Sequence, residues 1–290
     1  MIKSRSTKAG DWIIVAICCI LIFVCLLPML NVLARSLSST NYLIRNEVLL
    51  WPRGFTLEAY TTVLSDAKYT QSLGFTAVLT VFCTILSMTM TVLCAFPLIF
   101  DQLRGRKVIN AIIVLTMYFS AGQIPHYLLL KRLSMLDTVW ALIVPNCLSV
   151  FNMIIMRSFF FGIPDSLKEA AELDGAGPFR MLIRIYLPLS KSVLATLALF
   201  YAVGRWNGFS DALMYIKKND HLYPIQLLLY NILQNTTAIE VGTQEGFFDP
   251  GVGETLKMAT VMFATVPILL IYPWLQRYFV TGVTIGAVKG

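Results

Sequence analysis

The sequence predicts an all-α integral membrane protein with six transmembrane helices. The 290-residue chain is 57% hydrophobic and only 13% charged, a composition outside the range of soluble domains. Its mean hydropathy is +0.71. Six segments each contain about 20 or more mostly apolar residues, which is the length needed to cross a bilayer. The net charge of +7 is spread over short loops and forms no basic patch, which argues against nucleic-acid binding.

The six candidate spans are separated by polar turns and loops. They cover residues 12–34, 73–100, 108–130, 139–161, 193–216 and 258–279. The first could instead be a cleaved signal peptide, because Lys3, Arg5 and Lys8 precede an apolar core. However, the uncharged run 13–30 is longer than the usual signal-peptide core of about 7–15 residues, which favours a retained helix.

Basic residues near the helix ends predict the orientation in the membrane. With the amino terminus in the cytoplasm, the inner segments are 1–11, 101–107, 162–192 and 280–290. Most basic residues close to a helix end, including Arg104, Arg106 and Lys107, then face the cytoplasm, as the positive-inside rule requires. An even number of spans places the carboxyl terminus in the cytoplasm as well.

Cysteine and histidine usage does not indicate a disulfide framework or a metal site. All six cysteines fall in apolar stretches, where a free thiol behaves as a small hydrophobe. The chain has two histidines and no metal-ligand spacing. We therefore expect no disulfide and no metal.

The most regular polar pattern lies between the fourth and fifth spans. Ser166 is placed to cap a helix, and Glu169, three residues later, can reach back to it. Leu167, Ala170 and Ala171 then share one face at helical spacing. These residues predict a short amphipathic helix.

A stop and a second helix are expected directly after it. Gly175 stands where the first helix should end, because glycine tolerates the left-handed conformation common just past a helix end. Gly177 and Pro178 open the second helix, and Pro188 is expected to end it. Its apolar stripe consists of Phe179, Leu182, Ile183, Tyr186 and Leu187. The pattern leaves two readings open, a small-residue knob that docks another protein or an interfacial elbow without a partner.

The same loop resembles a known signature. Residues 169–171 (Glu-Ala-Ala), Gly175, Ile185 and 187–188 (Leu-Pro) fill every position of the EAA signature of the permease subunits of ATP-binding-cassette importers. We call residues 164–188 the EAA loop. A match at every signature position over this distance is poorly explained by chance.

The resemblance extends over nearly the whole chain. Segment 51–60 resembles the outer segment of the second, MalG-like permease of the maltose-type importers, in the oligosaccharide subfamily. Segments 206–209, 276–279 and 286–290 are similar to the same subfamily. Gly208 departs from it, because many relatives have an acidic residue after the Trp-Asn pair.

The resemblance implies a type I importer permease that is multi-pass in the bacterial inner membrane, with both termini cytoplasmic. Residues 1–72 would form an N-terminal transmembrane helix and an outer loop, and residues 73–290 the core, with a cytoplasmic coupling helix between helices 4 and 5. The implied partners are a second homologous permease, two ATPase subunits, an extracytoplasmic sugar-binding protein and membrane lipid, with no nucleic acid. The residues implied to contact the ATPase are Glu169, Ala170, Ala171, Asp174 and Gly175.

We do not expect the chain to be an enzyme by itself. It contains no Gly-Lys dipeptide, so a Walker A phosphate loop is excluded. The resemblance places ATP and Mg on the partner ATPase subunits, and no cofactor on this chain. A secondary transporter driven by an ion gradient is an alternative, although Asp211 is the sole acidic residue within the six spans. A non-transporting membrane scaffold is a second alternative.

Polar residues within the spans are candidates for lining a substrate path. Arg205 would cost about 2.5–3.5 kcal/mol if it faced lipid near the midplane, so it should face a cavity or a partner. Trp206 could stack on a sugar and Asn207 could bind hydroxyl groups, which makes this stretch the preferred lining. Gln123 and Asn152 are secondary candidates. A buried structural arginine bonded to carbonyls of a neighbouring helix is the open alternative.

Charge gives two further expectations for this stretch. Asp211 follows Arg205 by six residues, which is about 240° around a continuous helix, so the two are not expected to pair. If Arg205 faces the path, an anionic sugar such as a uronate oligosaccharide is attractive, because guanidinium and carboxylate match as a bidentate pair.

A polar stripe marks the second span. Thr76, Thr80 and Thr84 recur at four-residue spacing and therefore share one helical face. Small polar faces let membrane helices approach closely, so helix packing is favoured here over a substrate path.

Overall fold

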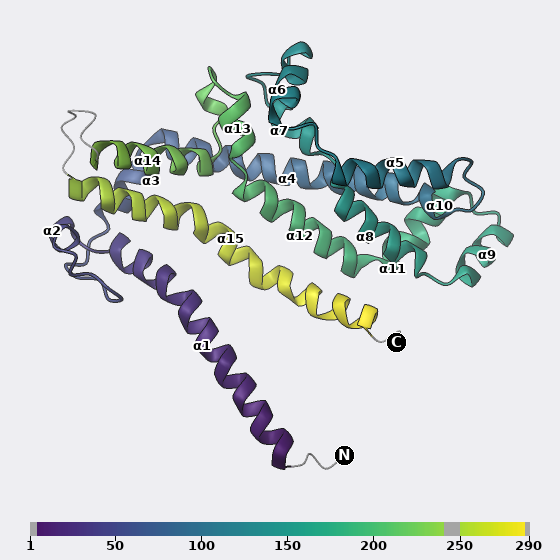
Figure 1. The fold of residues 1–290 in the computed structure, drawn as a ribbon, viewed down its shortest axis with the longest axis horizontal. Helices are drawn as coiled ribbons and strands as arrows, with labels where there is room; N and C mark the ends of the chain where they lie inside the picture. The colour runs from purple at the N-terminus through teal and green to yellow at the C-terminus, as the bar shows by residue number, and fades with distance from the viewer. Residues whose placement is uncertain (1–4, 241–249, 288–290) are drawn as a thin grey trace. The chain divides into compact units, whose positions relative to one another are not determined.

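The computed structural model describes residues 5–240 and 250–287, and these residues fold into helices (Figure 1). No strand occurs in the described part of the chain, where Ser38 and Phe55 form an isolated antiparallel bridge. The predicted all-α class is therefore confirmed. The last three residues of the 286–290 segment lie outside the described residues.

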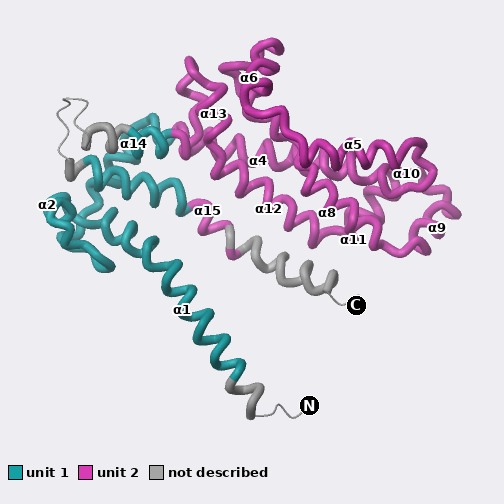
Figure 2. Tube along the Cα trace, viewed as in Figure 1, with its two compact units in different colours: residues 1–70, 228–266 teal, residues 71–227, 267–290 magenta. Residues whose placement is uncertain are grey.

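The chain divides into two compact units, each built from two stretches of sequence (Figure 2). Unit 1 comprises residues 1–70 and 228–266, and unit 2 comprises residues 71–227 and 267–290. The sequence-based division after residue 72 stays a prediction.

In unit 1, the long helix α1 (Arg5–Ser36) is anchored at its carboxyl end. Arg35 forms an ion pair with Glu254, near the start of α15 (Pro250–Ala287). The Ser36 hydroxyl hydrogen-bonds to that of Tyr60 in α3 (Glu58–Ser65) at 2.7 Å, and the short helix α2 (Thr40–Ile44) lies between α1 and α3 in sequence. None of the most apolar window of α1 is buried inside the chain, so its side chains must contact lipid or another subunit.

The helix lengths agree with the predicted number of spans. Three described segments are long and apolar enough to cross a membrane alone, namely Gly10–Ser36, Ala67–Ile99 and Gly253–Ile271. Three further helix pairs meet the same requirement together and are bent by more than 40°. If each bent pair is one span, the described residues contain up to six.

The expectation of a continuous span over 108–130 is wrong. Helix α5 (Arg106–Tyr118) ends early, and α6 (Gln123–Arg132) leaves it at 113°. Gly122, between them, has φ +85°, which glycine adopts most readily. Pro125, in the first turn of α6, would clash with the carbonyl four residues earlier in a continuous helix.

The next two expected spans, 139–161 and 193–216, are also broken. In the first, α7 (Trp140–Ile143) passes into the 3-10 turn η2 (Val144–Asn146), and α8 (Val150–Phe161) follows at 44°. In the second, α12 (Lys191–Asn207) and α13 (Ser210–Tyr215) are separated by Gly208, whose backbone is extended. Pro145 lacks the N–H that a continuous helix requires, which explains the first break.

The polar face of α4 (Ala67–Ala95) contacts backbone groups in unit 2, as the packing interpretation predicted. The Thr76 hydroxyl donates to the Ser72 carbonyl at 2.7 Å and accepts the N–H of Ile225 at 2.9 Å. The Ser72 hydroxyl donates to the Tyr223 carbonyl at 2.7 Å. These bonds fasten α4 to the segment that leads into α14 (Ile225–Glu240). The buried Thr80 hydroxyl, one turn further along, has no hydrogen-bond partner among the described residues.

Valine at Thr76 is expected to lower stability, and valine at Thr80 is not. Thr76→Val leaves the buried N–H of Ile225 without its acceptor, which costs about 1–3 kcal/mol. Thr80→Val removes an unpaired buried hydroxyl and should be neutral or stabilising. The free energy of unfolding, measured by SDS titration in mixed micelles, compares the two variants. Equal destabilisation would contradict this assignment of the hydrogen bonds.

A buried cluster in unit 2 joins α4, α8 and the EAA loop. The rings of Phe96, Phe160 and Tyr186 meet edge to face, with centroids 5.1 Å (Phe96 to Tyr186), 5.5 Å (Phe160 to Tyr186) and 6.0 Å (Phe96 to Phe160) apart. Such pairs stabilise beyond the area that they bury. The loop between α8 and α12 is therefore a packed part of the unit.

Candidate functional site

The first helix of the EAA loop, α9 (Asp165–Leu173), begins two residues earlier than the cap prediction requires. Pro164 occupies the N-cap position and makes no side-chain cap, so the predicted cap by Ser166 is wrong. Ser166 lies in the first turn of the helix. The carboxylate of Asp165 in that turn suits the positive end of the helix dipole.

The end of α9 confirms the prediction for Gly175. This residue has φ +71°, in the left-handed region. The N–H of Gly175 donates to the Glu172 carbonyl at 3.0 Å, and the N–H of Ala176 donates to the Ala171 carbonyl at 2.9 Å. These two bonds form a Schellman motif, which satisfies the last carbonyls of the helix.

The second half of the loop starts as predicted and ends later. Gly177 is the N-cap and Pro178 the first residue of α10 (Pro178–Met181), which continues through a π-helical turn, η3 (Leu182–Tyr186), into α11 (Leu187–Leu189). The helix therefore passes Pro188, contrary to expectation, and turns by 84° into α12. A wide π turn accommodates the missing N–H and the ring of the following proline.

The predicted apolar stripe of this second helix is half correct. Leu182 and Tyr186 are buried in the unit 2 cluster, together with Met181. Phe179 and Ile183 are exposed, and Phe179 is 69% exposed. The stripe is therefore split between the core and the surface.

The structure gathers four of the five predicted contact residues on one exposed surface. Glu169, Ala170, Asp174 and Gly175 are exposed, whereas Ala171 is 7% exposed and packs in the buried cluster. Leu173, 90% exposed, was not predicted. The sequence feature that could have predicted Leu173 as a contact residue is its position on α9 beside the Glu-Ala-Ala residues. We define the knob surface as Glu169, Ala170, Leu173, Asp174 and Gly175.

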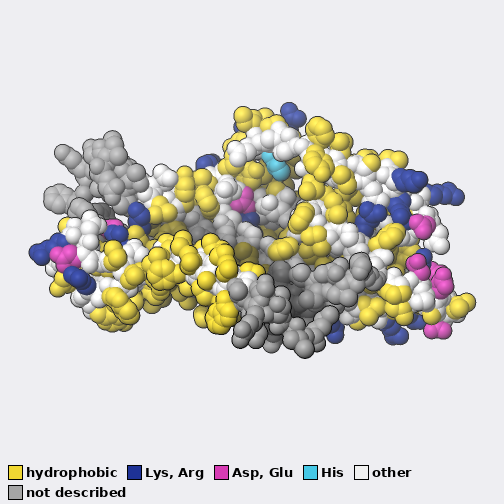
Figure 3. All heavy atoms as spheres, turned by 60° about the horizontal axis from the view of Figure 1, so that its bottom comes forward, with side chains coloured by type: hydrophobic (Ala, Val, Ile, Leu, Met, Phe, Trp, Pro, Cys, Tyr) yellow, Lys and Arg dark blue, Asp and Glu magenta, His cyan; other side chains and the backbone are white. Residues whose placement is uncertain are grey.

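The surroundings of the knob surface are charged. α9 and α10 lie at one end of unit 2 (Figure 1), and acidic and basic side chains gather at that end (Figure 3). A charged, exposed surface with small residues suits a protein partner in water more than a lipid contact.

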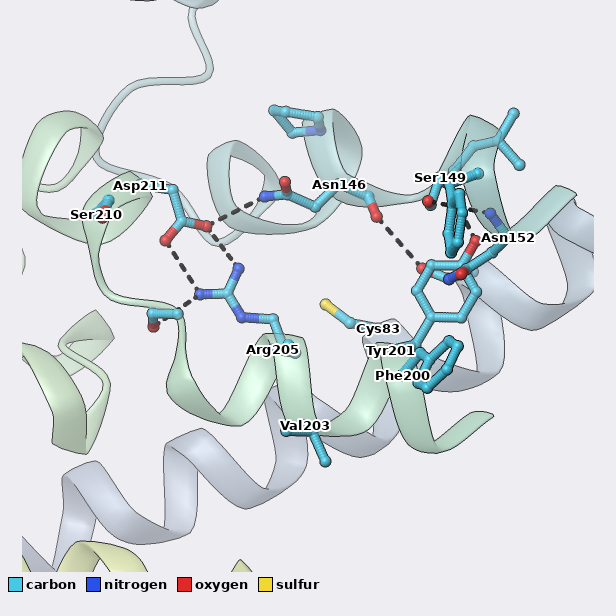
Figure 4. Close-up of a pocket in the computed structure, with 16 residues that line it drawn as sticks. Cys83, Asn146, Ser149, Asn152, Phe200, Tyr201, Val203, Arg205, Ser210 and Asp211 are labelled. Atoms are coloured by element: carbon cyan, nitrogen blue, oxygen red, sulfur yellow. Dashed lines mark hydrogen bonds and ion pairs between the residues drawn. The ribbon is translucent and has the colours of Figure 1, made fainter. Parts of the chain in front are cut away.

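A second candidate site is a pocket of about 810 Å³ in unit 2, lined by α4, the break between η2 and α8, and the α12–α13 break (Figure 4). Its polar lining includes Asn146, Ser149, Asn152, Arg205 and Asp211. Its volume falls in the range of about 300–1,000 Å³ that is typical of small-molecule sites.

Arg205, which is buried, and Asp211, which is partly buried, form an ion pair in this pocket, so the expectation that they do not pair is wrong. The two guanidinium nitrogens lie 2.5 and 3.1 Å from the carboxylate oxygens (Figure 4). The expectation assumed a continuous helix, but α12 ends at Asn207, Gly208 is extended, and α13 starts at Ser210.

The remaining bonds of Arg205 go to backbone carbonyls. Its guanidinium donates to the Leu142 carbonyl at 3.2 Å and to the Gly208 carbonyl at 3.3 Å. Leu142 lies in the last turn of α7, where carbonyls lack helical partners. The bond to Leu142 is the contact with a neighbouring helix that the alternative of a structural arginine predicted.

Further contacts hold α13, which carries Asp211. The Asn146 side chain donates to the Asp211 carboxylate at 3.2 Å. Beyond the end of α13, Asp137 accepts the backbone N–H groups of Lys217 at 2.5 Å and Lys218 at 2.7 Å. The N–H groups of Lys218 and Lys217 hold the pKa of Asp137 below its ordinary value.

Asn152 has a different environment from the other polar residues of the pocket. It is 5% exposed, and its backbone N–H donates to Ser149 Oγ. Its side-chain carboxamide makes no hydrogen bond to any described residue. This group is therefore available to a ligand in the pocket.

The pocket brings together two of the five predicted path residues. Arg205 and Asn152 line it, whereas Trp206 is buried elsewhere, and Asn207 and Gln123 are exposed outside it. The prediction missed Tyr201, whose hydroxyl bonds to Thr91 at 2.7 Å and accepts the N–H of Ser149. Its spacing to Arg205 on α12 was the available signal.

The fold and the EAA loop define a class of protein, the membrane-spanning permease subunit of an importer. The chain belongs to the family described as “Binding-protein-dependent transport system inner membrane component”, which residues 73–285 match. The predicted family and the multi-pass inner-membrane location are confirmed. The orientation of the termini stays a prediction.

Individual relatives agree with this family. The chain is 39% identical to Protein LplC of Bacillus subtilis (strain 168), over 99% of this chain and 98% of that protein. It is 38% identical to the polygalacturonan/rhamnogalacturonan transport system permease protein YtcP of the same organism, over 92% and 93%. A solved bacterial ABC transporter involved in import of the acidic polysaccharide alginate matches with TM-score 0.84 and 30% identity, over 96% of this chain and 99% of that one. The type I importer permease fold is confirmed.

Proposed function

We propose that this chain is one permease subunit of an ATP-driven oligosaccharide importer. In this proposal it pairs with a second, homologous permease and receives substrate from an extracytoplasmic binding protein. Separate ATPase subunits, which hold the ATP and Mg, dock on the knob surface and drive the switch between outward and inward openings. The chain itself performs no catalysis, and both of its termini lie in the cytoplasm.

The construction of the EAA loop is the observation that carries this proposal. The knob surface is exposed, while Ala171 on the other side of the same helix is packed in the cluster that joins α4 and α8. A force applied to Glu169 or Leu173 would therefore reach the membrane helices through packed contacts. An interfacial elbow without a partner would not need an exposed leucine beside an acidic face.

The substrate class rests on the relatives and not on Arg205. The names of two relatives refer to polygalacturonan, rhamnogalacturonan and alginate, which suggests oligomers rich in acidic sugars. Arg205 gives no independent support, because its charge is paired with Asp211 and its other bonds go to carbonyls. Arg205 therefore does not predict a uronate substrate.

The complete importer, reconstituted in liposomes with its binding protein, tests the proposal. Oligosaccharide uptake is expected to require ATP inside the vesicles and to continue when ionophores collapse the ion gradients. Vesicles that hold this chain without ATPase subunits are the control and should show no uptake. Uptake driven by an ion gradient in the absence of ATP would support a secondary transporter instead, and no uptake under any condition would favour a scaffold.

A further inference from the structure

The pocket in unit 2 is electrically balanced. Of the residues that line it in the described chain, Arg205 and Asp211 are the two that carry charge, and they form an ion pair with each other. The side chains are 7% and 16% exposed. A carboxylate entering the pocket would have to displace Asp211 from both guanidinium nitrogens, which leaves one anion without its partner.

The available polar group in the pocket is neutral. The Asn152 carboxamide offers two N–H donors and one carbonyl acceptor, and it makes no hydrogen bond to any described residue. A ligand with hydroxyl groups would supply hydrogen-bond partners to this amide, which belongs to a residue that is 5% exposed. An acyl chain of a lipid offers nothing to this amide.

Two aromatic side chains complete the lining. Phe151, at the start of α8, is 53% exposed, and Phe200 on α12 is 42% exposed, and both border the pocket. Figure 4 shows Phe200 next to Tyr201 and on the same side of the pocket as Asn152. An aromatic face carries partial negative charge and attracts the C–H groups on the apolar face of a sugar ring.

We infer that this pocket is a subsite for a sugar ring of the substrate. It binds the ring through its hydroxyl groups and its apolar face and does not recognise a carboxylate. The inference rests on the proposed function. Asn152 would bind hydroxyl groups, Phe200 would support the ring, and the Arg205–Asp211 pair would keep the lining neutral. Discrimination between acidic and neutral oligosaccharides is then left to other parts of the importer.

Equilibrium dialysis tests the inference on the complete permease and ATPase assembly, purified without the binding protein. The probes are an oligogalacturonate and the same oligomer after reduction of its carboxylates to alcohols. The wild-type dissociation constants should agree within about threefold. Asn152→Ala should raise both by the same factor, roughly three- to tenfold, which is the value of one or two neutral hydrogen bonds.

A second variant and a control keep the result interpretable. Phe200→Leu keeps an apolar side chain at a half-exposed position and should also raise both dissociation constants. Thr89→Ala, at an exposed threonine of α4 outside the pocket lining, should change neither. Unchanged binding in either pocket variant, no binding to the wild type, or a tenfold wild-type preference for the acidic oligomer would overturn the inference.

Uptake separates this inference from the proposed function. ATP-driven uptake by the wild type, together with unchanged binding in the pocket variants, would contradict the sugar subsite and still support the importer function. The absence of ATP-driven uptake of any oligosaccharide would contradict the importer function, whatever dissociation constants equilibrium dialysis gives.

Discussion

Gly175→Val is expected to lower oligosaccharide uptake at least tenfold while the subunits still assemble. The left-handed backbone at φ +71° costs about 1–2 kcal/mol for a residue with a Cβ, and more for a β-branched one. A Cβ at this position would meet no other atom, so the penalty comes from the backbone and not from a clash. The Schellman motif would open and displace the knob surface. Uptake and ATP hydrolysis, measured together in reconstituted importer, report the uncoupling.

Gly177→Val is the matched control in the same loop. Gly177 has φ −68° and ψ 164°, which suits any residue before a proline, and a Cβ there also meets no atom. It should leave uptake near the wild-type rate. Gly175→Asn should fall between the two, because asparagine tolerates the left-handed region. Normal uptake with Gly175→Val, or an equal loss with Gly177→Val, would rule out the role given to this helix end.

Asp211→Ala is expected to destabilise the protein by about 3–5 kcal/mol, because it leaves the guanidinium of Arg205 buried without its counterion. Arg205 is 8% exposed, so water entering the pocket would replace the lost carboxylate only in part. The break between α12 and α13 would lose the two bonds that join Arg205 to Asp211 across it. SDS titration of the purified permease gives the free energy of unfolding.

A double-mutant cycle separates the pair from its parts. Arg205→Met should also destabilise, by less, because the Asp211 carboxylate would still accept from Asn146 and from the N–H of Ala212. The combined Arg205→Met/Asp211→Leu variant should recover most of the lost stability, since apolar replacement of both members of a buried pair is often close to neutral. Additive losses in the double variant would show that the two side chains do not act as a pair.

The stop and the restart inside the EAA loop could be predicted because they depend on local chemistry. Gly175 and the Gly177-Pro178 pair specify a stop and a start through backbone preferences that need no tertiary information. The burial of Ala171 could not be predicted in this way. Ala170 and Ala171 are neighbours in sequence, and only the packing of Phe160 and Tyr186 decides which of the two faces the core.

The pocket was harder to predict because hydropathy shows where apolar residues accumulate and not where a helix breaks. The segments 108–130 and 193–216 are mostly apolar, yet each contains a glycine at which its helix is interrupted. Once a break is missed, every angular relation across it is wrong, as with Arg205 and Asp211. A glycine between two apolar half-spans was the available signal for each break.

The three interlocked rings of Phe96, Phe160 and Tyr186 determine how stiffly this part of the molecule responds to load. Edge-to-face rings at these separations resist sliding, because a small shear would separate each hydrogen-bearing edge from the face that it contacts. A force on α9 would then move the adjoining ends of α4 and α8 together. The loop itself would not bend.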